Sequence, residues 1–233
     1  SHAASFAHLV YVSAWLKWAY PDVFACALLN AQPMGFYAPA QIVRDAREHG
    51  VEIYHVDVNE SGWDNSLEPM CGEKHALRLG FRQISGISEE EGQRIEKARG
   101  NGYPTLSDLQ RRARLSLKTL ESLAAGDCFQ SLGLDRRNAL WHVRGLDKGG
   151  PLPLFEYAEA EAIGTDTHVD LPEMTLGENV VTDYQTLRLS LKAHPLSLLR
   201  PYFSQEGVIP ALDLLSCKNG EIVQLTGLVL VRQ

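Results

Sequence analysis

The sequence has few cysteines, and their spacing indicates neither a metal site nor a disulfide framework. The four cysteines of this 233-residue chain lie far apart, and none belongs to a Cys-x-x-Cys pair, the spacing typical of zinc sites. The sequence also lacks any apolar run approaching the roughly 18 residues that suggest a membrane span. No signal peptide opens it. We therefore expect a protein of the reducing cytoplasm, with no metal site in this chain and no membrane partner.

A net positive charge is lacking as well, since the formal charge is −7. This average argues against a nucleic-acid partner, but the charge is unevenly distributed. Residues 1–72 carry 3 Lys and Arg against 8 Asp and Glu, residues 73–149 carry 14 against 10, and residues 150–233 carry 5 against 11. Only the middle third is basic, and clustered cations matter more to phosphate binding than the net charge does.

The basic third contains an apolar rise that runs into a tight turn, Ser85-Gly86-Ile87-Ser88, and then into a predicted helix. Gly86 suits a sharp reversal because it has no Cβ to clash at positive φ. Ser88 is predicted to cap the helix, with Glu91 completing a capping box. Such a hairpin, with Ile87 at its tip, directs backbone N–H groups and a helix N-terminus outward, which favours phosphate. The alternative interpretation is an ordinary capped helix after a turn.

A second helix, glycine-containing turn and helix follow further along the chain. The helix capped by Ser116 ends at Gly126, and the next one is predicted from Leu134 to Val143. Between Gly100 and Ser116, Ser107 is predicted to cap a short helix rich in arginine. A pseudo-symmetric pair of such units is far more specific than one, so we predict a tandem helix-hairpin-helix domain over residues 73–147.

The charges at the two helix starts differ. Arg136 and Arg137 in the first turn of the last helix oppose the helix dipole, which is explained if phosphate approaches there; the alternative is a solvated basic face. Glu89, Glu90 and Glu91 would instead repel phosphate at the first hairpin, so we expect the second unit to make more of the DNA contact. The predicted DNA-contacting residues are Gly86, Ile87, Ser88, Arg94, Lys97, Gly133, Arg136 and Arg137.

The first eighty residues predict helices followed by a small sheet. Helical periodicity runs from Ser5 to Tyr20 and from Val23 to Ala31, and a short helix from Ala40 to His49 is closed by Gly50. A strand is predicted from Val51 to Val58, with partners near Leu67 and within residues 77–81. The first helix carries aromatic side chains among aliphatic ones, so we predict core packing, with base stacking as the alternative. These aromatic residues are Tyr11, Trp15, Trp18 and Tyr20.

Residues 148–185 are acidic and rich in proline and glycine, which predicts a flexible linker. It contains an isolated apolar pentapeptide, Pro-Leu-Pro-Leu-Phe, at residues 151–155. An exposed apolar cluster usually marks a partner site, so Leu152, Leu154 and Phe155 are predicted partner contacts. The alternative is that they fold back on the preceding helix. Residues 186–233 end in a predicted strand whose two faces are both apolar, and which therefore requires a larger sheet or barrel.

Several stretches resemble the bacterial C-family DNA polymerases, the family of the DNA polymerase III alpha subunit. Some are similar to the end of its fingers domain, and two of these resemble the error-prone, damage-inducible branch more than the replicative one. Others are similar to the approach to its OB-fold and to the first strand of that fold. The stretches are SHAASFA (1–7), AWLK (14–17), QPMGFY (32–37), DAREHGV (45–51), LSL (189–191), HPL (194–196) and GLV (227–229).

The resemblance implies a mainly α chain in four parts. These are the end of the fingers at 1–72, the tandem helix-hairpin-helix domain at 73–147, an acidic linker with a clamp-binding peptide at 148–185, and the lead-in and first strand of an incomplete OB-fold at 186–233. It also implies a C-terminal segment of an error-prone DNA-directed DNA polymerase that uses Mg²⁺ and deoxynucleoside triphosphates. Such a polymerase acts in translesion synthesis with the sliding clamp and other mutagenesis proteins.

The chain begins without Met and ends within an apolar stretch, so we expect a segment of a longer protein. Carboxylates that hold the polymerase metals would lie upstream of Ser1. We therefore assign no catalytic residue, and none to Asp57 or Asp64, and expect the segment alone to be inactive.

The sequence departs from the family pattern at three places. Ser88 stands where the hairpin often has a second glycine, Pro151 stands where the clamp peptide begins with Gln, and the OB-fold stops after one strand. Two other classes remain open. One is a stand-alone DNA-binding scaffold. The other is a helix-hairpin-helix glycosylase, which would need a Lys or Asp beside the hairpin in a base-sized pocket. Lys118 is expected to lie remote from the first hairpin, which disfavours this second class.

Overall fold

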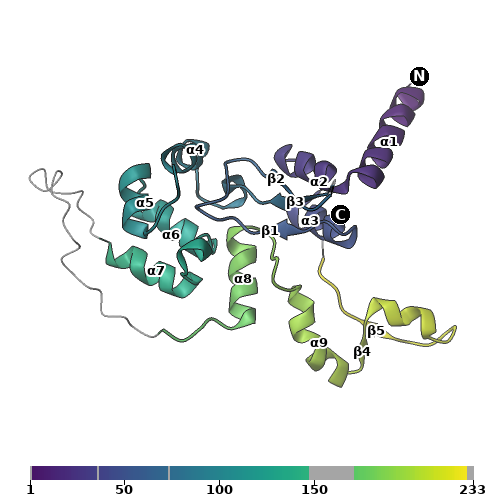
Figure 1. Ribbon diagram of the computed structural model, residues 1–233. Coiled ribbons are helices and arrows are strands. Elements are labelled where there is room, and N and C mark those ends of the chain that lie inside the picture. The colour runs from purple at the N-terminus through teal and green to yellow at the C-terminus, as the bar shows by residue number, and fades with distance from the viewer. Residues whose placement is uncertain (1, 36, 73, 147–170, 230–233) are drawn as a thin grey trace, which may run out of the picture.

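The computed structural model describes residues 2–35, 37–72, 74–146 and 171–229 (Figure 1). In these ranges the chain is mainly helical with small sheets, as predicted. No helix among them is both long and apolar enough to cross a membrane.

The N-terminal part begins with α1 (His2–Ala19), α2 (Pro21–Asn30) and α3 (Pro39–Glu48). Figure 1 shows α1 extending away from the rest of the chain, and it has no buried residue. The predicted core packing of its aromatic residues, Tyr11, Trp15, Trp18 and Tyr20, is therefore wrong, since Trp15 is 48% and Trp18 80% exposed. The helix is apolar on all sides, and helical periodicity does not specify what covers a helix. An ion pair of 2.7 Å from Lys17 Nζ to Asp45 joins α1 to α3.

A three-stranded sheet follows, built from β1 (Ile53–Tyr54), β2 (Ser66–Pro69) and β3 (His75–Arg78) in the order β1-β3-β2. The central strand β3 is parallel to β1 and antiparallel to β2, so Leu77 is the register partner of both Ile53 and Leu67. The predicted pairing of the first strand with residues 77–81 is confirmed at Leu77, but the predicted pairing near Leu67 is wrong, because β3 lies between β1 and β2. The sheet and the core beneath it cross the predicted boundary between residues 72 and 73. The basic domain therefore shares β3 with the preceding part and does not begin as a separate unit.

The helical middle consists of the 3-10 helix η1 (Phe81–Gln83), α4 (Glu89–Ala98), α5 (Leu106–Ala113), α6 (Leu117–Ala125), the 3-10 helix η2 (Gln130–Leu132) and α7 (Arg136–Gly145). Helix α4 packs on α5, and α6 packs on α7. Ser116 caps α6 as predicted. The predicted cap at Ser107 is wrong, because Thr105 Oγ1 accepts the Asp108 N–H and the helix begins before Ser107.

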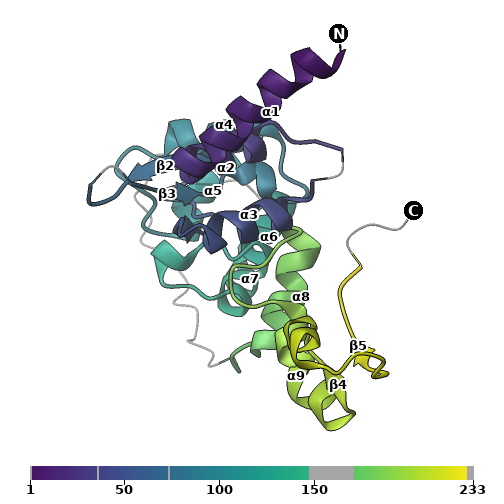
Figure 2. The ribbon, with the colours of Figure 1, turned by 90° about the vertical axis from the view of Figure 1, so that its right-hand side faces the viewer.

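Helix α8 (Leu176–Thr186) lies within the range predicted as flexible linker, and this part of the prediction is wrong. Thr175 and Glu178 form a capping box at its start, and Val180 and Asp183 are buried. Figures 1 and 2 both show α8 beside the helical middle, where it contacts α6. The acidic composition predicted a solvated segment. The Glu178 carboxylate instead caps α8, and the Asp183 carboxylate forms an ion pair with Arg136. The pentapeptide at 151–155 lies outside the described residues.

The C-terminal part contains α9 (Pro195–Gln205), β4 (Val208–Ile209), the 3-10 helix η4 (Ala211–Ser216) and β5 (Gln224–Leu225). Strands β4 and β5 pair in parallel, with Val208 opposite Gln224. Much less of the predicted final strand is paired than its apolar pattern suggested, and Ile222 and Val229 are exposed. Two paired residues do not define a barrel, so the OB-fold stays a prediction.

Candidate nucleic-acid interface

The first hairpin has the backbone that its sequence predicted. Gly86 adopts φ +89°, and a Cβ there would also lie 3.3 Å from Ser122 Oγ. Among the described residues, the N–H groups of Gly86 and Ile87 have no hydrogen-bond acceptor. The Ile87 side chain, however, packs into the core and is only 9% exposed. An apolar residue at the tip gains more by burial, so a DNA contact by Ile87 would have to use its backbone N–H.

The start of α4 is occupied by the chain's own carboxylate. Glu91 Oε2 accepts the Ser88 N–H at 2.9 Å, and the Glu91 N–H donates to Ser88 Oγ, so the predicted capping box is confirmed. Glu91 Oε1 also accepts the Thr119 hydroxyl from α6 at 2.5 Å. Partial burial raises the pKa of Glu91, but the hydrogen bonds from Thr119 and Ser88 outweigh it and hold the pKa below its ordinary value. The charged carboxylate thus fills the place that an anion would take at this helix end.

Exposed cations lie on α4, at the end of α5 and on α6. Arg94 and Lys97 are exposed on α4, and Arg114 and Lys118 are exposed on either side of the Ser116 cap of α6. None of these four side chains forms an ion pair or hydrogen bond with a residue that the structure describes. We call this set the α4 basic face. The Glu91–Thr119 contact corrects the expectation that Lys118 lies remote from the first hairpin.

Sequence reasoning missed Arg114 and Lys118 as members of this face. Arg114 ends α5 and Lys118 lies in the first turn of α6, and the hydrogen bond from Thr119 to Glu91 joins α6 to the start of α4. The local signal available was their position beside Ser116, which caps the helix that makes the contact.

The second hairpin is tied to the loop after β1. Asp57 Oδ2 accepts the Ser131 N–H at 3.0 Å, and Asn59 Nδ2 donates to Ser131 Oγ at 3.0 Å. Gly133 adopts φ +71°, and no atom lies within 4 Å of where its Cβ would be. Asp135 caps α7 through the Asn138 N–H. Gly133 is therefore accessible, but part of this turn already donates to the protein.

The two arginines at the start of α7 are directed toward the protein. Arg136 is 4% exposed, donates through Nη2 to the carboxylate of Asp183, and donates through Nη1 to the Asn179 carbonyl oxygen at 2.9 Å. Its Nε has no hydrogen-bond partner among the described residues. The prediction that Arg136 contacts DNA is wrong, because a side chain in a buried ion pair is not available to phosphate.

Arg137 is half-buried beside the same segment. Its Nη1 donates to the Pro172 carbonyl oxygen at 2.6 Å, and its Nη2 lies 3.6 Å from Glu178 Oε1. The two cations on which the expected larger DNA contact of the second unit rested are thus engaged by residues 172–183, which counts against that expectation.

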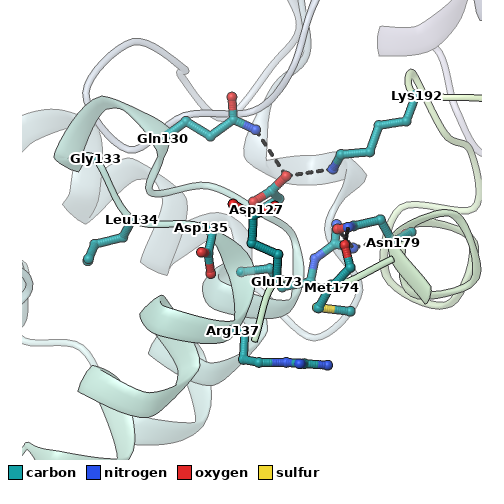
Figure 3. A pocket seen from close by; sticks show the side chains of 11 residues that line it. Asp127, Gln130, Gly133, Leu134, Asp135, Arg137, Glu173, Met174, Asn179 and Lys192 are labelled. Carbon is teal, nitrogen blue, oxygen red and sulfur yellow. Dashed lines mark hydrogen bonds and ion pairs between the residues drawn. The ribbon is translucent and has the colours of Figure 1, made fainter. Parts of the chain in front are cut away.

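A cavity of about 360 Å³ lies between the second hairpin and the start of α8 (Figure 3). Lys192 Nζ and Gln130 Nε2 both donate to Asp127 Oδ2, at 2.6 and 3.0 Å. Because Asp127 already pairs with this lysine, the cavity offers no free amine of the kind a glycosylase would use. In the ranges that the structure describes, no three His, Cys, Asp or Glu side chains are grouped as metal ligands.

The predicted helix-hairpin-helix motif is confirmed, since a family model described as "Helix-hairpin-helix motif" matches residues 50–139. The chain is also homologous over its whole length to a C-terminal part of error-prone DNA polymerases. It is 53% identical over 236 residues to the one from Ruegeria pomeroyi, 52% over 233 residues to the one from Brucella abortus, and 50% over 254 residues to the one from Sinorhizobium medicae. All of this chain is covered in each case, but only 21%, 22% and 23% of those proteins. The predicted similarity to error-prone polymerases is confirmed.

Proposed function

We propose that this chain is part of an error-prone DNA-directed DNA polymerase and that it binds duplex DNA without sequence preference. The relatives' names and the helix-hairpin-helix motif support the polymerase and the DNA partner. The observations that carry the binding mode are the α4 basic face, whose four cations pair with no described residue, and the first hairpin, whose Gly86 and Ile87 N–H groups donate to no described acceptor. Cations and backbone amides contact phosphates and carry no sequence information.

In this proposal the segment positions the duplex, and the chemistry belongs to the longer polymerase. Mg²⁺ would there stabilise the charge that develops when a deoxynucleoside triphosphate is joined to the primer. No described residue of this chain is given that role, and Asp57 instead holds the turn of the second hairpin. We propose further that the longer polymerase acts in translesion synthesis together with other mutagenesis proteins, and that it is located in the cytoplasm.

The binding mode predicts a duplex affinity of about 10⁻⁴ to 10⁻⁶ M that falls steeply with salt. Replacing Arg94 and Lys97 together by glutamate should weaken binding at least about tenfold and lower the slope of log affinity against log salt by about two, roughly one for each phosphate that the variant no longer neutralises. Fluorescence anisotropy of a labelled duplex across a salt titration measures both.

The matched control places the same charge change on α3, by replacing Arg44 and Arg47 with glutamate. This control should retain most of the affinity and the slope, because only the general field changes. If the two double variants bind DNA equally, the α4 basic face is not the contact surface.

We also propose the sliding clamp as a partner, through Leu152, Leu154 and Phe155. The support is the apolar pentapeptide and its place in the chain, and these residues lie outside the described ranges. Each apolar side chain that enters a pocket contributes about 1.5–3 kcal/mol before ordering costs, and Pro151 lacks the polar contact of a Gln. We expect micromolar or weaker binding that is lost in Leu154→Ala with Phe155→Ala. Equal binding by that variant in a clamp titration would contradict the proposal.

A further inference from the structure

Helix α8 contacts both hairpins, although it lies outside the residues that the helix-hairpin-helix family model matches. At its C-terminal end, the Thr186 carbonyl oxygen accepts the Ser85 N–H of the first hairpin at 2.8 Å. Along its length, Asp183 and Asn179 hold Arg136 at the start of α7. A single helix thus bridges the two hairpins, and Figures 1 and 2 show it lying along the helical middle.

The contact between α7 and α8 is buried, and most polar groups in it are hydrogen-bonded. Asp183 is 3% exposed and accepts from Arg136 and from Ser190 Oγ, the latter at 2.7 Å, while Lys192 Nζ lies 3.7 Å away. Lys192 extends the network to Asp127 in the second hairpin. A charge is retained in such a place only when it is paired, so Asp183 and Arg136 each depend on the other.

Apolar packing adds to this polar contact. Val180 is buried on α8, and Leu187 and Leu189, which directly follow the helix, belong to the main core. Helix α8 is therefore docked as a part of the domain and does not rest loosely on its surface.

We propose that α8 is a positioning element of the DNA-binding unit, in which Asp183 is the positioning residue and the two hairpins are held at one separation. This inference rests on the proposed DNA-binding function. By accepting the Ser85 N–H, α8 fixes the chain just before Gly86 and Ile87, whose N–H groups donate to no described acceptor. By holding Arg136, α8 is itself fixed to the second hairpin. In this proposal the second hairpin supports α8 and does not contact phosphate. A preformed surface binds more tightly because less ordering is required on association.

The test compares two variants of the full chain with the unmodified protein. Asp183→Asn removes the charge that holds Arg136 and should release α8. Arg136→Met with Asp183→Leu replaces the ion pair by apolar side chains of similar size. In other proteins, this kind of replacement of a buried ion pair is often neutral or stabilising. Docking is measured by hydrogen exchange of the peptide that contains Ser85, and duplex affinity by fluorescence anisotropy.

We expect Asp183→Asn to speed exchange at Ser85 and to weaken duplex binding roughly 5- to 20-fold, the usual size of a coupling between sites. The apolar double variant should restore slow exchange and affinity, with an unchanged salt slope, because Arg136 contacts no phosphate. A merely structural role would not make affinity follow the exchange rate at Ser85 in variants that remain folded.

Four results would overturn the positioning role. Three concern Asp183→Asn: unchanged hydrogen exchange at Ser85, faster exchange with unchanged duplex affinity, or a rise in duplex affinity, which would mean that α8 blocks DNA. The fourth is a lower salt slope in the apolar double variant. Absence of any duplex binding by the unmodified protein would instead overturn the proposed function, and the positioning role with it. The exchange data would then still show separately whether Asp183 docks α8.

Discussion

Replacing Gly80 by alanine is expected to destabilise the protein by at least about 3 kcal/mol. Gly80 directly precedes η1, and its N–H donates to Asn65 Oδ1 at 3.0 Å. A Cβ at this position would lie 2.4 Å from the carbonyl oxygens of both Trp63 and Asp64. Those atoms are backbone, so no side-chain rotation relieves the clash and the chain before β2 has to move.

Chemical denaturation measures the free energy of unfolding for this variant. Gly35→Ala is the matched control, since no atom lies within 4 Å of the Cβ it would add. The control should change stability by no more than about 0.5 kcal/mol. Equal stabilities for the two variants would show that the close approach between Gly80 and residues 63–64 is not a feature of the folded protein.

Asp57→Ala should cost about 3 kcal/mol of stability. Asp57 is 2% exposed, and its carboxylate accepts the N–H groups of Asn59 and Ser131 at 2.8 and 3.0 Å. Hydrogen bonds to charged groups contribute about 1.5–3 kcal/mol each, and the substitution leaves both donors without this acceptor. The same change should loosen the second hairpin, which would be seen as faster hydrogen exchange at Ser131.

The control is Asp64→Ala, which removes a carboxylate whose side chain is 61% exposed and pairs with Arg82. An exposed pair contributes about 0–1 kcal/mol, so this variant should stay near the stability of the unmodified protein. A destabilisation by Asp64→Ala as large as that by Asp57→Ala would contradict the assignment of Asp57 as the buried acceptor that joins the two loops.

The sequence by itself determined the features that depend on neighbouring residues. The capping box of Ser88 and Glu91 and the turn at Gly86 involve groups within a few residues of one another, so propensity and spacing were sufficient to predict them. The short apolar runs also indicated where the strands lie, whereas the order β1-β3-β2 was not predicted. The similarity to error-prone polymerases was also present in contiguous motifs.

Only the tertiary structure decided which charged and apolar groups face outward. Arg136 and Arg114 are both arginines at helix ends, yet one pairs with Asp183, 47 residues away, while the other stays exposed. Asp183 itself stood in a segment whose composition predicted disorder. The apolar and aromatic side chains of α1 resembled those of a core helix, although no residue of α1 is buried. Periodicity and composition report what a segment prefers, whereas burial and pairing depend on partners distant in the chain.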